Sequence, residues 1–508
     1  MEFLSFPLSS ALLIILLFML VKKAIQNKNS KLPPGPRKLP VIGSLHHLIG
    51  DGLPHHALRN LAKKHGPLMH LQLGENSTLV VSSSKMAKAI MSTHDLMFAN
   101  RTVQFATDIL LYGGKGIGLA PYGDYWRQIR KICVLELLSA KRVQSFQTVR
   151  EEEISNLIRS ISAESSKVNF SEMITSLTND IIARAAFGEK CKDKHAFLSL
   201  IEEGIQLAGG FDIAGLFPSL KLLHVITGKK RQLERVHNEL DRILVDIIKE
   251  NKEKRRASKL NEDKYEENLV DVLLRVQENT KLEVPLANDN IKAVILDIFV
   301  AGSETSSTTI EWAMSEMLKN PRVMKKAQAE VRRVFSGNKK INETEIQELS
   351  YLKLVLKETL RLHAPAPLLI PRECRESCEI DGYEIPKKTM VMVNAWAIGR
   401  DPENWSNGDR FEPERFDGIS VDYKGTNFEY IPFGAGRRIC PGMLFGMANV
   451  EVPLARLLYH FDWELPNDIK PEELDMDETF GTTVRRKNHL YLIPTVVHEL
   501  ERSSTTKE

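Results

Sequence analysis

The sequence contains little of what several common protein classes require. Its 508 residues include only five cysteines, an odd and sparse set that does not form a disulfide framework and fits a reducing compartment. The formal net charge is only +3, whereas proteins that act mainly on nucleic acid usually carry a strong basic excess. The chain also has no internal repeat and no low-complexity tract. These shortages argue against a disulfide scaffold and against nucleic acid as a partner.

Two sequence motifs are also missing. No G-x-G-x-x-G stands between a strand and a helix, so we expect that the chain does not bind a nicotinamide dinucleotide itself. The fourteen histidines are scattered and form no H-E-x-x-H motif. Cys374 and Cys378 have a spacing that permits a metal site, but no further ligand pair is evident, and we interpret both as ordinary thiols.

The N-terminus has the features of a membrane anchor. Residues 3–21 carry no charge, and about 20 such residues suffice to cross a bilayer core. Basic residues follow from Lys22 onward and predict a body that faces the cytosol. The alternative is a cleaved signal peptide, but neither a basic leader nor a cleavage site is evident. We therefore predict a transmembrane anchor over 1–23, a basic, proline-rich hinge over 24–40, a catalytic body over 41–500 and a polar tail over 501–508.

Periodicity predicts a mainly α body with a small β portion. Asn288–Lys319 is expected to be the longest helix, about 45 Å long, which Asn288 or Asn290 caps and Asn320-Pro321 ends. A second helix is expected over Tyr351–His363. A hairpin is expected within 67–82, short strands within 378–394, and a charged loop over 250–268.

The most informative segment is the glycine-rich loop 432–442, which holds Cys440 just before an expected helix. A helix N-terminus and free backbone N–H groups stabilise a thiolate. The glycines let backbone approach a flat cofactor, and Arg438 can reach an anionic carboxylate on it.

This loop resembles the haem-binding loop of the cytochromes P-450, F-x-x-G-x-R-x-C-x-G, and has all its fixed residues, including Phe433, Arg438, Cys440 and Gly442. The alternative is a buried structural cysteine. The resemblance implies a cytochrome P-450 fold, haem b as cofactor, Cys440 as axial ligand of the iron, and Phe433, Arg438 and Gly442 as cofactor-binding residues. A thiolate ligand favours O–O cleavage.

Other motifs extend the resemblance. Glu358 and Arg361 match the family's E-x-x-R pair, and Arg415 lies in its P-E-R-F element. The resemblance implies one structural charge network that holds the cysteine loop, although E-x-x-R alone is usually an exposed helix pair. Trp126 and Arg130 match a W-x-x-x-R helix. Together with Arg372 and Arg438 they are implied partners of the haem propionates.

Residues 301–306 match the family's oxygen-activation motif A-G-x-[DE]-T. A glycine inside a helix costs about 1 kcal/mol, which is understandable at Gly302 if something flat lies against the backbone. The resemblance implies that Ala301 and Gly302 border the oxygen site, that Thr305 binds dioxygen or water, and that Glu304 relays protons. The alternative is that Thr305 bonds back to a carbonyl and Glu304 is solvated.

The resemblance also implies an apolar substrate pocket, in which Asp297 and Asp212 are the candidate polar contacts. Its expected lining is Ile109, Leu110, Leu111, Ile295, Ile298, Leu368, Leu369, Ile370 and Thr482. Electrons are expected from NADPH through a membrane-bound cytochrome P-450 reductase, with cytochrome b5 as a possible second partner. Arg127, Lys131, Lys424 and Arg437 are candidates for attracting an acidic partner.

The leading hypothesis is a monooxygenase of the plant microsomal type. It would use O2 to oxidise a hydrophobic molecule such as a terpenoid or a terpenoid-derived alkaloid, at the cytosolic face of the endoplasmic reticulum membrane and in contact with lipid. Two alternatives stay open: a reductase-independent haem-thiolate isomerase or dehydratase, and a non-catalytic haem-binding protein. The intact Glu304-Thr305 pair argues against the isomerase or dehydratase.

Thiolate ligation by Cys440 predicts a strongly red-shifted Soret band in the carbon monoxide difference spectrum of reduced microsomes that express the chain. Cys440→His is expected to abolish that band, because imidazole donates less electron density than thiolate. Absence of the band from well-expressed, haem-loaded wild-type protein would show that the ligand assignment is wrong.

Overall fold

The computed structural model describes residues 31–50, 52–102, 104–164, 166–188, 194–209, 213–220, 227–261, 267–278, 282–336, 343–481 and 483–500. The predicted anchor, residues 24–30 of the predicted hinge and the predicted polar tail lie outside these ranges. Within them, no helix combines the length and the apolar composition that crossing a bilayer requires.

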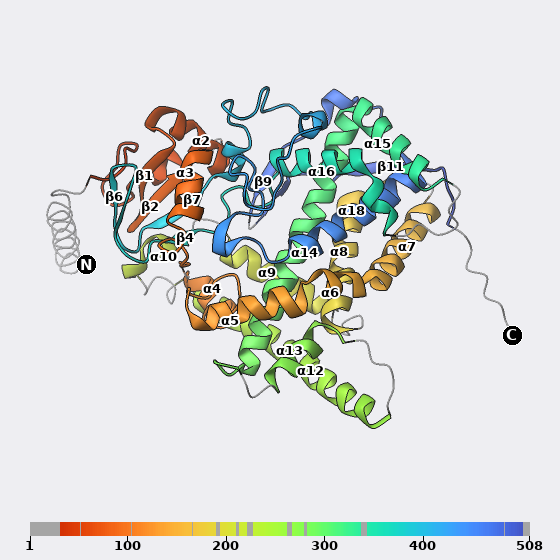
Figure 1. The fold of residues 1–508 in the computed structure, drawn as a ribbon, viewed down its shortest axis with the longest axis horizontal. Coiled ribbons are helices and arrows are strands. Elements are labelled where there is room, and N and C mark those ends of the chain that lie inside the picture. Colours follow the sequence, from red (N-terminus) through yellow and green to blue (C-terminus); the bar gives the residue numbers. More distant parts are fainter. Residues whose placement is uncertain are drawn as a thin grey trace, which may run out of the picture.

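The body is mainly helical, as predicted, with its strands gathered in small sheets (Figure 1). The helices are α2 Pro54–His65, α3 Ser84–Lys88, α4 Phe105–Leu110, α5 Asp124–Ile132, α6 Ala140–Ser145, α7 Gln147–Ala163, α8 Phe170–Phe187, α9 Lys194–Ala208, α10 Ile213–Leu216, α12 Lys229–Asn261, α13 Leu269–Gln277, α14 Asn288–Lys319, α15 Pro321–Val334, α16 Ser350–Leu362, α17 Ala395–Ile398 and α18 Met443–His460. The strands are β1 Leu68–Leu73, β2 Asn76–Val81, β3 Val168–Asn169, β4 Arg372–Glu373, β5 Cys378–Ile380, β6 Tyr383–Ile385, β7 Met390–Val393, β8 Phe461–Glu464, β9 Glu478–Phe480, β10 Val484–Arg486 and β11 Tyr491–Val496.

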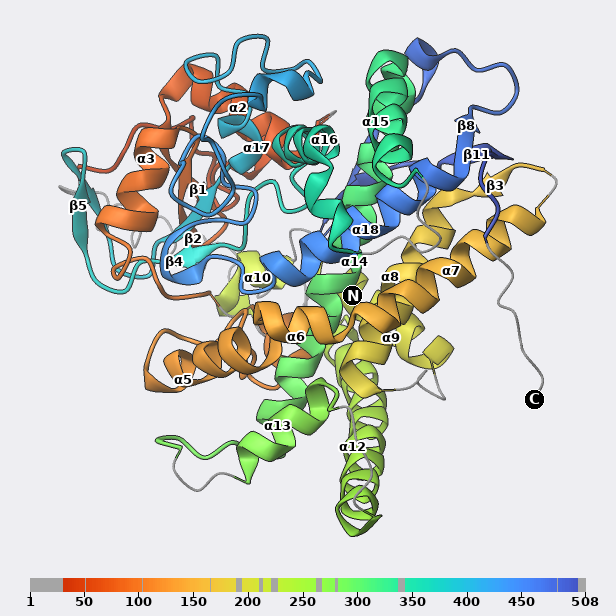
Figure 2. The same cartoon turned by 45° about the vertical axis from the view of Figure 1, so that its right-hand side comes forward.

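Helix α14 runs through the middle of the body and packs against α8, α16 and α18 (Figure 2). Its bounds are those predicted. The Asn290 side chain accepts a hydrogen bond from the backbone N–H of Ala287 at 2.7 Å, and the helix ends at Asn320 before Pro321. It is one residue shorter than α12, so the prediction that it is the longest helix was wrong. Residues that are buried almost all around α14 make it the central element of the core.

The segment 250–261 is helical, which corrects the predicted charged loop. Lysine, arginine and glutamate are strong helix formers, so a charged composition does not by itself end a helix. Asn251 fixes this part of α12: its side chain donates to the Ile247 carbonyl at 2.8 Å and accepts from the Asn268 amide at 2.7 Å. The charged end of α12 extends away from the rest of the body (Figure 2).

The larger sheet has the order β1-β2-β7-β4. Strands β1 and β2 form the predicted hairpin, and β7 joins β2 in parallel. The predicted short strands are β5, β6 and β7, and the β5–β6 turn is at Asp381-Gly382, where both residues have positive φ. Because β4 pairs with β7, Arg372 is held on an edge strand that leads into the functional site.

Candidate functional site

Cys440 lies between a short 3-10 turn, Gly436–Arg438, and the N-terminus of α18. Its backbone N–H donates to the Phe433 carbonyl at 3.0 Å, which closes the loop. Burial raises the pKa of the Cys440 thiol, while the Gly442 N–H and the Arg130 charge act in the opposite direction. A metal ion at the sulfur would reverse the effect of burial, because coordination deprotonates a thiol.

Gly436 is the position in this loop where only glycine fits. Its φ is +69°, and a Cβ there would lie 2.0 Å from the Met91 carbonyl oxygen. The next residue continues this close approach, because the Arg437 N–H donates to the Asp95 carboxylate at 2.8 Å. The cysteine loop is therefore clamped against the chain around residues 91–95.

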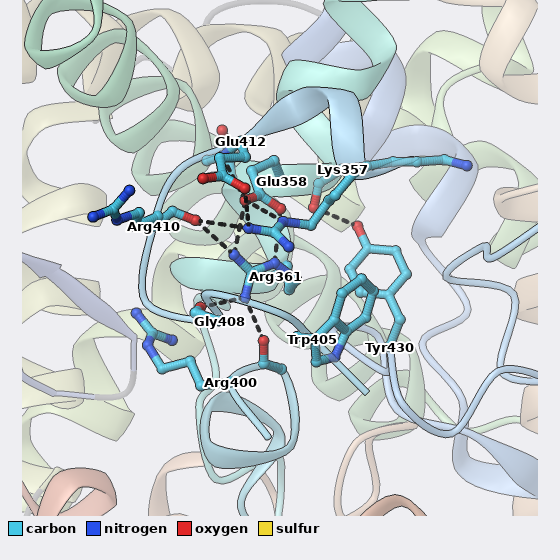
Figure 3. A network of polar contacts seen from close by, with 12 residues as sticks. Lys357, Glu358, Arg361, Arg400, Trp405, Gly408, Arg410, Glu412 and Tyr430 are labelled. Carbon is cyan, nitrogen blue, oxygen red and sulfur yellow. Dashed lines mark hydrogen bonds and ion pairs between the residues drawn. The ribbon is translucent and has the colours of Figure 1, made fainter. Parts of the chain in front are cut away.

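The predicted charge network is present and buried (Figure 3). Glu358 and Arg361 have fully buried side chains joined by two hydrogen bonds, of 2.7 and 2.8 Å. Arg415 donates from Nε to the Glu358 carboxylate at 2.9 Å, and so does the backbone N–H of Glu412 at 2.8 Å. The structure thus brings together all three residues that the sequence predicted for this network.

This network holds the long irregular segment that precedes the cysteine loop. Arg361 donates to the carbonyls of Gly408 at 2.6 Å and Arg410 at 3.0 Å, and its guanidinium lies 5.3 Å from the Trp405 ring (Figure 3). Tyr430 is anchored on α16 through its hydroxyl, which donates to the Lys357 carbonyl at 2.8 Å. Contacts from α16 therefore fix the backbone of this segment up to the start of the cysteine loop.

Four guanidinium groups converge beside Cys440. Burial lowers the pKa of Arg101, and the neighbouring charges of Arg372, Arg438 and Arg130 lower it further. Within the described ranges, Asp95 is the carboxylate that pairs with this cluster, at 3.0 Å from Arg372. Such an excess of buried positive charge fits the two propionates of a haem, because buried cations require anionic partners.

The individual cations differ in what they already bind. Arg438 donates to the carbonyls of Ala99 at 2.7 Å and Ala120 at 2.6 Å. Trp126 donates its indole N–H to the Ile117 carbonyl at 3.0 Å and lies under Arg438. Trp126 was expected to bind a propionate, but in this structure its single N–H is already used for the Ile117 carbonyl. Its ring instead supports the Arg438 guanidinium, 4.2 Å from the ring centre.

Arg101 is a site residue that the sequence reasoning missed. Its guanidinium donates to the carbonyls of Pro371 at 3.0 Å, Gly118 at 3.2 Å and Ile370. It thereby joins the segment after α16 to the loop before α5. The sequence signal was the segment 98–102, which resembles a segment of related plant sequences but has Thr102 where they usually have proline, and no role was assigned to its arginine.

The oxygen-activation motif lies in the middle of α14. Ala301 is exposed although it lies near the centre of a long, mostly buried helix. The Thr305 hydroxyl donates to the Ala301 carbonyl at 2.6 Å, which is the alternative arrangement considered for this residue. Glu304 is not solvated at Oε2, because that atom is buried and has no hydrogen-bond partner among the described residues.

Gly302 lies close to the side chains of two neighbouring helices. A Cβ at this position would lie 3.0 Å from the Ile182 side chain of α8 and 4.0 Å from Phe445 of α18. The glycine therefore lets α8 approach α14 closely. Ala301, which is exposed, is the motif residue that can face a flat cofactor.

The predicted substrate-pocket residues divide into two groups. Leu110, Ile295 and Ile298 are buried in one core cluster, against which Ile109 and Leu111 are partly buried. Leu110 and Ile295 are 6% and 2% exposed. Leu368 is partly buried against a second core cluster, Leu369 is partly buried as well, and Ile370 is 48% exposed. Thr482 and Asp212 lie outside the described residues.

Asp297, a candidate polar contact for substrate, makes its hydrogen bond within the protein. Its carboxylate accepts the Gly118 N–H at 2.8 Å, and a Cβ on Gly116 would lie 2.2 Å from its Oδ2. Burial raises its pKa to about 6, although N–H groups of Gly118 and Ile117 act in the opposite direction. Asp297 therefore joins α14 to the loop before α5.

The basic surface residues are partly neutralised. Arg127 is paired with Asp124, Lys424 with Asp422 at 3.2 Å, and Arg437 lies 3.7 Å from Asp95. Lys131 is exposed on the same helix as Arg127.

Comparisons with known proteins agree on one family. A family model described as Cytochrome P450 matches residues 33–493. A "Desmethyl-deoxy-podophyllotoxin synthase" of Sinopodophyllum hexandrum is 99% identical over 508 residues, which is all of both chains. A "Premnaspirodiene oxygenase" of Hyoscyamus muticus is 53% identical, over 96% of this chain and 97% of its own. A "5-epiaristolochene 1,3-dihydroxylase" of Nicotiana tabacum is 54% identical, over 95% and 97%.

Solved structures agree as well. A zebra fish cytochrome P450 structure with abiraterone is 25% identical with a TM-score of 0.71, and one with progesterone is 24% identical with a TM-score of 0.73. Each comparison covers 88% of this chain and all of the other.

Glu358→Gln is expected to destabilise the protein by about 3–5 kcal/mol, because it leaves the buried Arg361 and Arg415 without their carboxylate. Haem content per polypeptide and the thermal unfolding midpoint should both fall. Glu412→Gln is the matched control: it removes the exposed partner of Arg415, 3.2 Å away, and should cost under about 1 kcal/mol. Equal haem content in the two variants would contradict the role of Glu358.

Asp297→Asn should stabilise the fold at pH 7.5. The folded-state pKa of Asp297, about 6, is above the usual 3.8. At pH values between the two, the folded protein therefore binds this proton more fully than the unfolded chain does. Wild-type stability from this group is therefore full below about pH 4 and falls as pH rises through about 6, by on the order of 3 kcal/mol. An asparagine can still accept the Gly118 N–H and carries no charge.

Thermal unfolding at pH 5 and pH 7.5 measures this effect. The advantage of Asp297→Asn should be present at pH 7.5 and shrink at pH 5. Asp297→Ala, which loses the hydrogen bond, should be less stable than wild type at pH 5. An advantage of Asp297→Asn that does not change with pH would refute the titration of Asp297.

Proposed function

The chain belongs to the cytochrome P450 family and is a monooxygenase, and we propose that it removes a methyl group from a methylated deoxy-podophyllotoxin. The observation that carries this proposal is the 99% identity, over the whole length of both chains, to a synthase whose name describes a desmethyl product. The residues that shape a pocket of this chain are therefore nearly all shared with that enzyme.

The chemistry is that of a monooxygenase acting on a methyl carbon bound to oxygen. One oxygen atom of O2 enters a C–H bond of the methyl group, and the other is reduced to water with two electrons and two protons. The resulting hemiacetal breaks its O–CH2 bond and releases formaldehyde, which leaves a hydroxyl group on the skeleton. The methyl carbon is oxidised and O2 is reduced.

The residues beside Cys440 fit a haem, which supplies dioxygen activation when bound. In the proposal, Cys440 is the thiolate ligand, and the Gly442 N–H stabilises its negative charge. Arg101, Arg130 and Arg438 neutralise the propionates, with Arg372 holding the loop through the Ala435 carbonyl at 2.7 Å. Phe433 supports the loop through its ring, whose centre lies 5.2 Å from the centre of the Tyr423 ring.

Thr305 and Glu304 are proposed to deliver the protons. The Thr305 hydroxyl lies on the same helix face as the exposed Ala301, and its oxygen keeps lone pairs that can accept a hydrogen bond. Glu304 has a buried carboxylate oxygen that needs a donor, and a water or a protonated carboxyl would satisfy it. The pair can therefore hold a proton beside Ala301.

The exposed Ile370 and the partly buried Leu369 are proposed to orient the apolar skeleton. Electrons are proposed to come from NADPH through a reductase, with cytochrome b5 as a second donor. Lys131 and Arg437 are proposed as parts of the docking face. We also propose that residues 1–23 anchor the chain in the endoplasmic reticulum membrane, with the body on the cytosolic side.

A second candidate function is hydroxylation of a terpenoid. The observation that favours it is the identity of 53–54% to an oxygenase named for premnaspirodiene and a dihydroxylase named for 5-epiaristolochene. The identity of 99% outweighs it, because pocket side chains differ far more at half identity.

The test is turnover by the full-length, haem-loaded chain with a plant NADPH reductase. With deoxy-podophyllotoxin as substrate we expect a product that has lost one CH2 unit, formaldehyde in equal amount, and no product without NADPH. Thr305→Ala should lower product formation by about 100-fold while NADPH consumption continues, because the general-acid contribution is lost. Thr305→Ser keeps the hydroxyl and should retain most of the activity.

A hydroxylated product without formaldehyde would contradict the demethylation. Product from premnaspirodiene but none from deoxy-podophyllotoxin would favour the second candidate. Full coupling in Thr305→Ala would show that the Thr305 hydroxyl does not deliver protons.

A further inference from the structure

A cluster of imidazole and carboxylate groups lies where α2, α16 and β9 meet. His55 and His56 come from the first turn of α2, Glu478 begins β9, and His363 directly follows α16. Figure 1 shows that α2 and β9 belong to opposite ends of the chain, since they are coloured orange-red and blue. The side chains of His55, His363 and Glu478 are 0%, 8% and 9% exposed.

The nitrogen and oxygen atoms of this cluster point toward one another. His55 Nε2 lies 3.0 Å, and His56 Nε2 3.4 Å, from the same oxygen of Glu478. One ligand atom from each of these three residues lies within 4.8 Å of the others. Ligands of a tetrahedral zinc ion with bonds of 2.0–2.1 Å are separated by about 3.4 Å, so the spacing is close to that of a metal site.

Some nitrogen atoms of this cluster have no hydrogen-bond partner among the described residues. His56 Nε2 is a buried atom 3.4 Å from Glu478, yet its geometry makes no hydrogen bond among the described residues. His363 Nδ1 likewise has no hydrogen-bond partner there, and lies 3.7 Å from the other oxygen of Glu478. Buried polar atoms without partners carry a free-energy cost that a bound ion would remove.

We propose that His55, His56 and Glu478 bind one divalent cation of the zinc class. Imidazole nitrogens with one carboxylate oxygen suit zinc, and three protein ligands leave the fourth position to water.

Groups around the cluster support this assignment. His363 Nε2 lies 2.7 Å from the Glu316 carboxylate, so His363 is fixed beside Glu478 as an outer support. Arg400 is the nearby positive charge. It is paired with Asp409 at 3.2 Å and stacked on Trp396, which offsets its repulsion of a cation. The side chain of His56 is 40% exposed, which gives an ion a path from solvent.

The proposed ion would join two distant parts of the chain. It connects α2, which packs against β1 of the larger sheet, to the β9–β10 hairpin. That hairpin is bound to the α16 end through the Val484 N–H and the Pro365 carbonyl at 2.9 Å, and to α14 through Trp312 and the Val484 carbonyl at 3.2 Å. The ion would therefore stabilise the hairpin beside the residues that follow α16, a site separate from the haem.

The test uses the full-length, haem-loaded protein, freed of any purification tag and treated with a chelator. Zinc chloride is titrated, and zinc per iron is measured by elemental analysis after desalting, with the thermal unfolding midpoint in parallel. We expect one tightly held zinc per iron and a higher unfolding midpoint. His56→Gln should weaken zinc binding by at least about tenfold. His65→Gln, at the other end of α2, is the matched control and should bind like wild type.

Zinc binding by His56→Gln equal to that of wild type, or no zinc retained and no shift in the wild-type midpoint, would overturn the proposal. The carbon monoxide spectrum and the metal-free unfolding midpoint of His56→Gln should match those of wild type. If they do not, X-ray absorption at the zinc edge of the wild-type protein decides instead. Two imidazole nitrogens and oxygen support the site, and sulfur ligation or an all-oxygen shell overturns it.

Discussion

The buried carboxylate of Glu358 is the interaction on which the rest of the site depends. It accepts hydrogen bonds from two guanidiniums and one backbone N–H in a region that water does not reach. Without Glu358, Arg361 and Arg415 would be unpaired charges in the interior. Breaking a buried charge network of this kind costs far more free energy than its formation contributes. Since Arg361 also binds carbonyls of the irregular segment 399–410, the chain that leads to Cys440 has one arrangement.

A second set of ties places the cysteine loop against the rest of the body. Gly436 lies against the Met91 carbonyl, Arg438 reaches the Ala99 and Ala120 carbonyls, and Asp297 binds the Gly118 N–H. All these contacts converge on the stretch of chain from 91 to 120. These contacts fix the positions of Ala301 on α14 and of the Cys440 thiol. The residues that make them do not take part in the proposed reaction.

Local rules predicted the elements well and some roles poorly. The bounds of α14 and the turn at Asp381-Gly382 follow from capping, proline and turn chemistry, which act within a few residues. The predicted charged loop was wrong over 250–261, because charged residues are also good helix formers. Gly302 has Ile182 as a neighbour, some 120 positions earlier in the chain. Neighbours of that kind cannot be seen in a periodic pattern.

The sequence by itself determined the chemistry: a cysteine in a glycine-rich loop before a helix, with an arginine two positions away, has few other uses. It also determined which side chains share a helix face, as for Glu358 and Arg361. Only the tertiary structure decided that Arg101 joins the cations at Cys440, that Ile295 is core, and that Glu478 meets His55 and His56. Such encounters depend on how helices and strands pack over hundreds of residues, and burial then sets the charge state of each group.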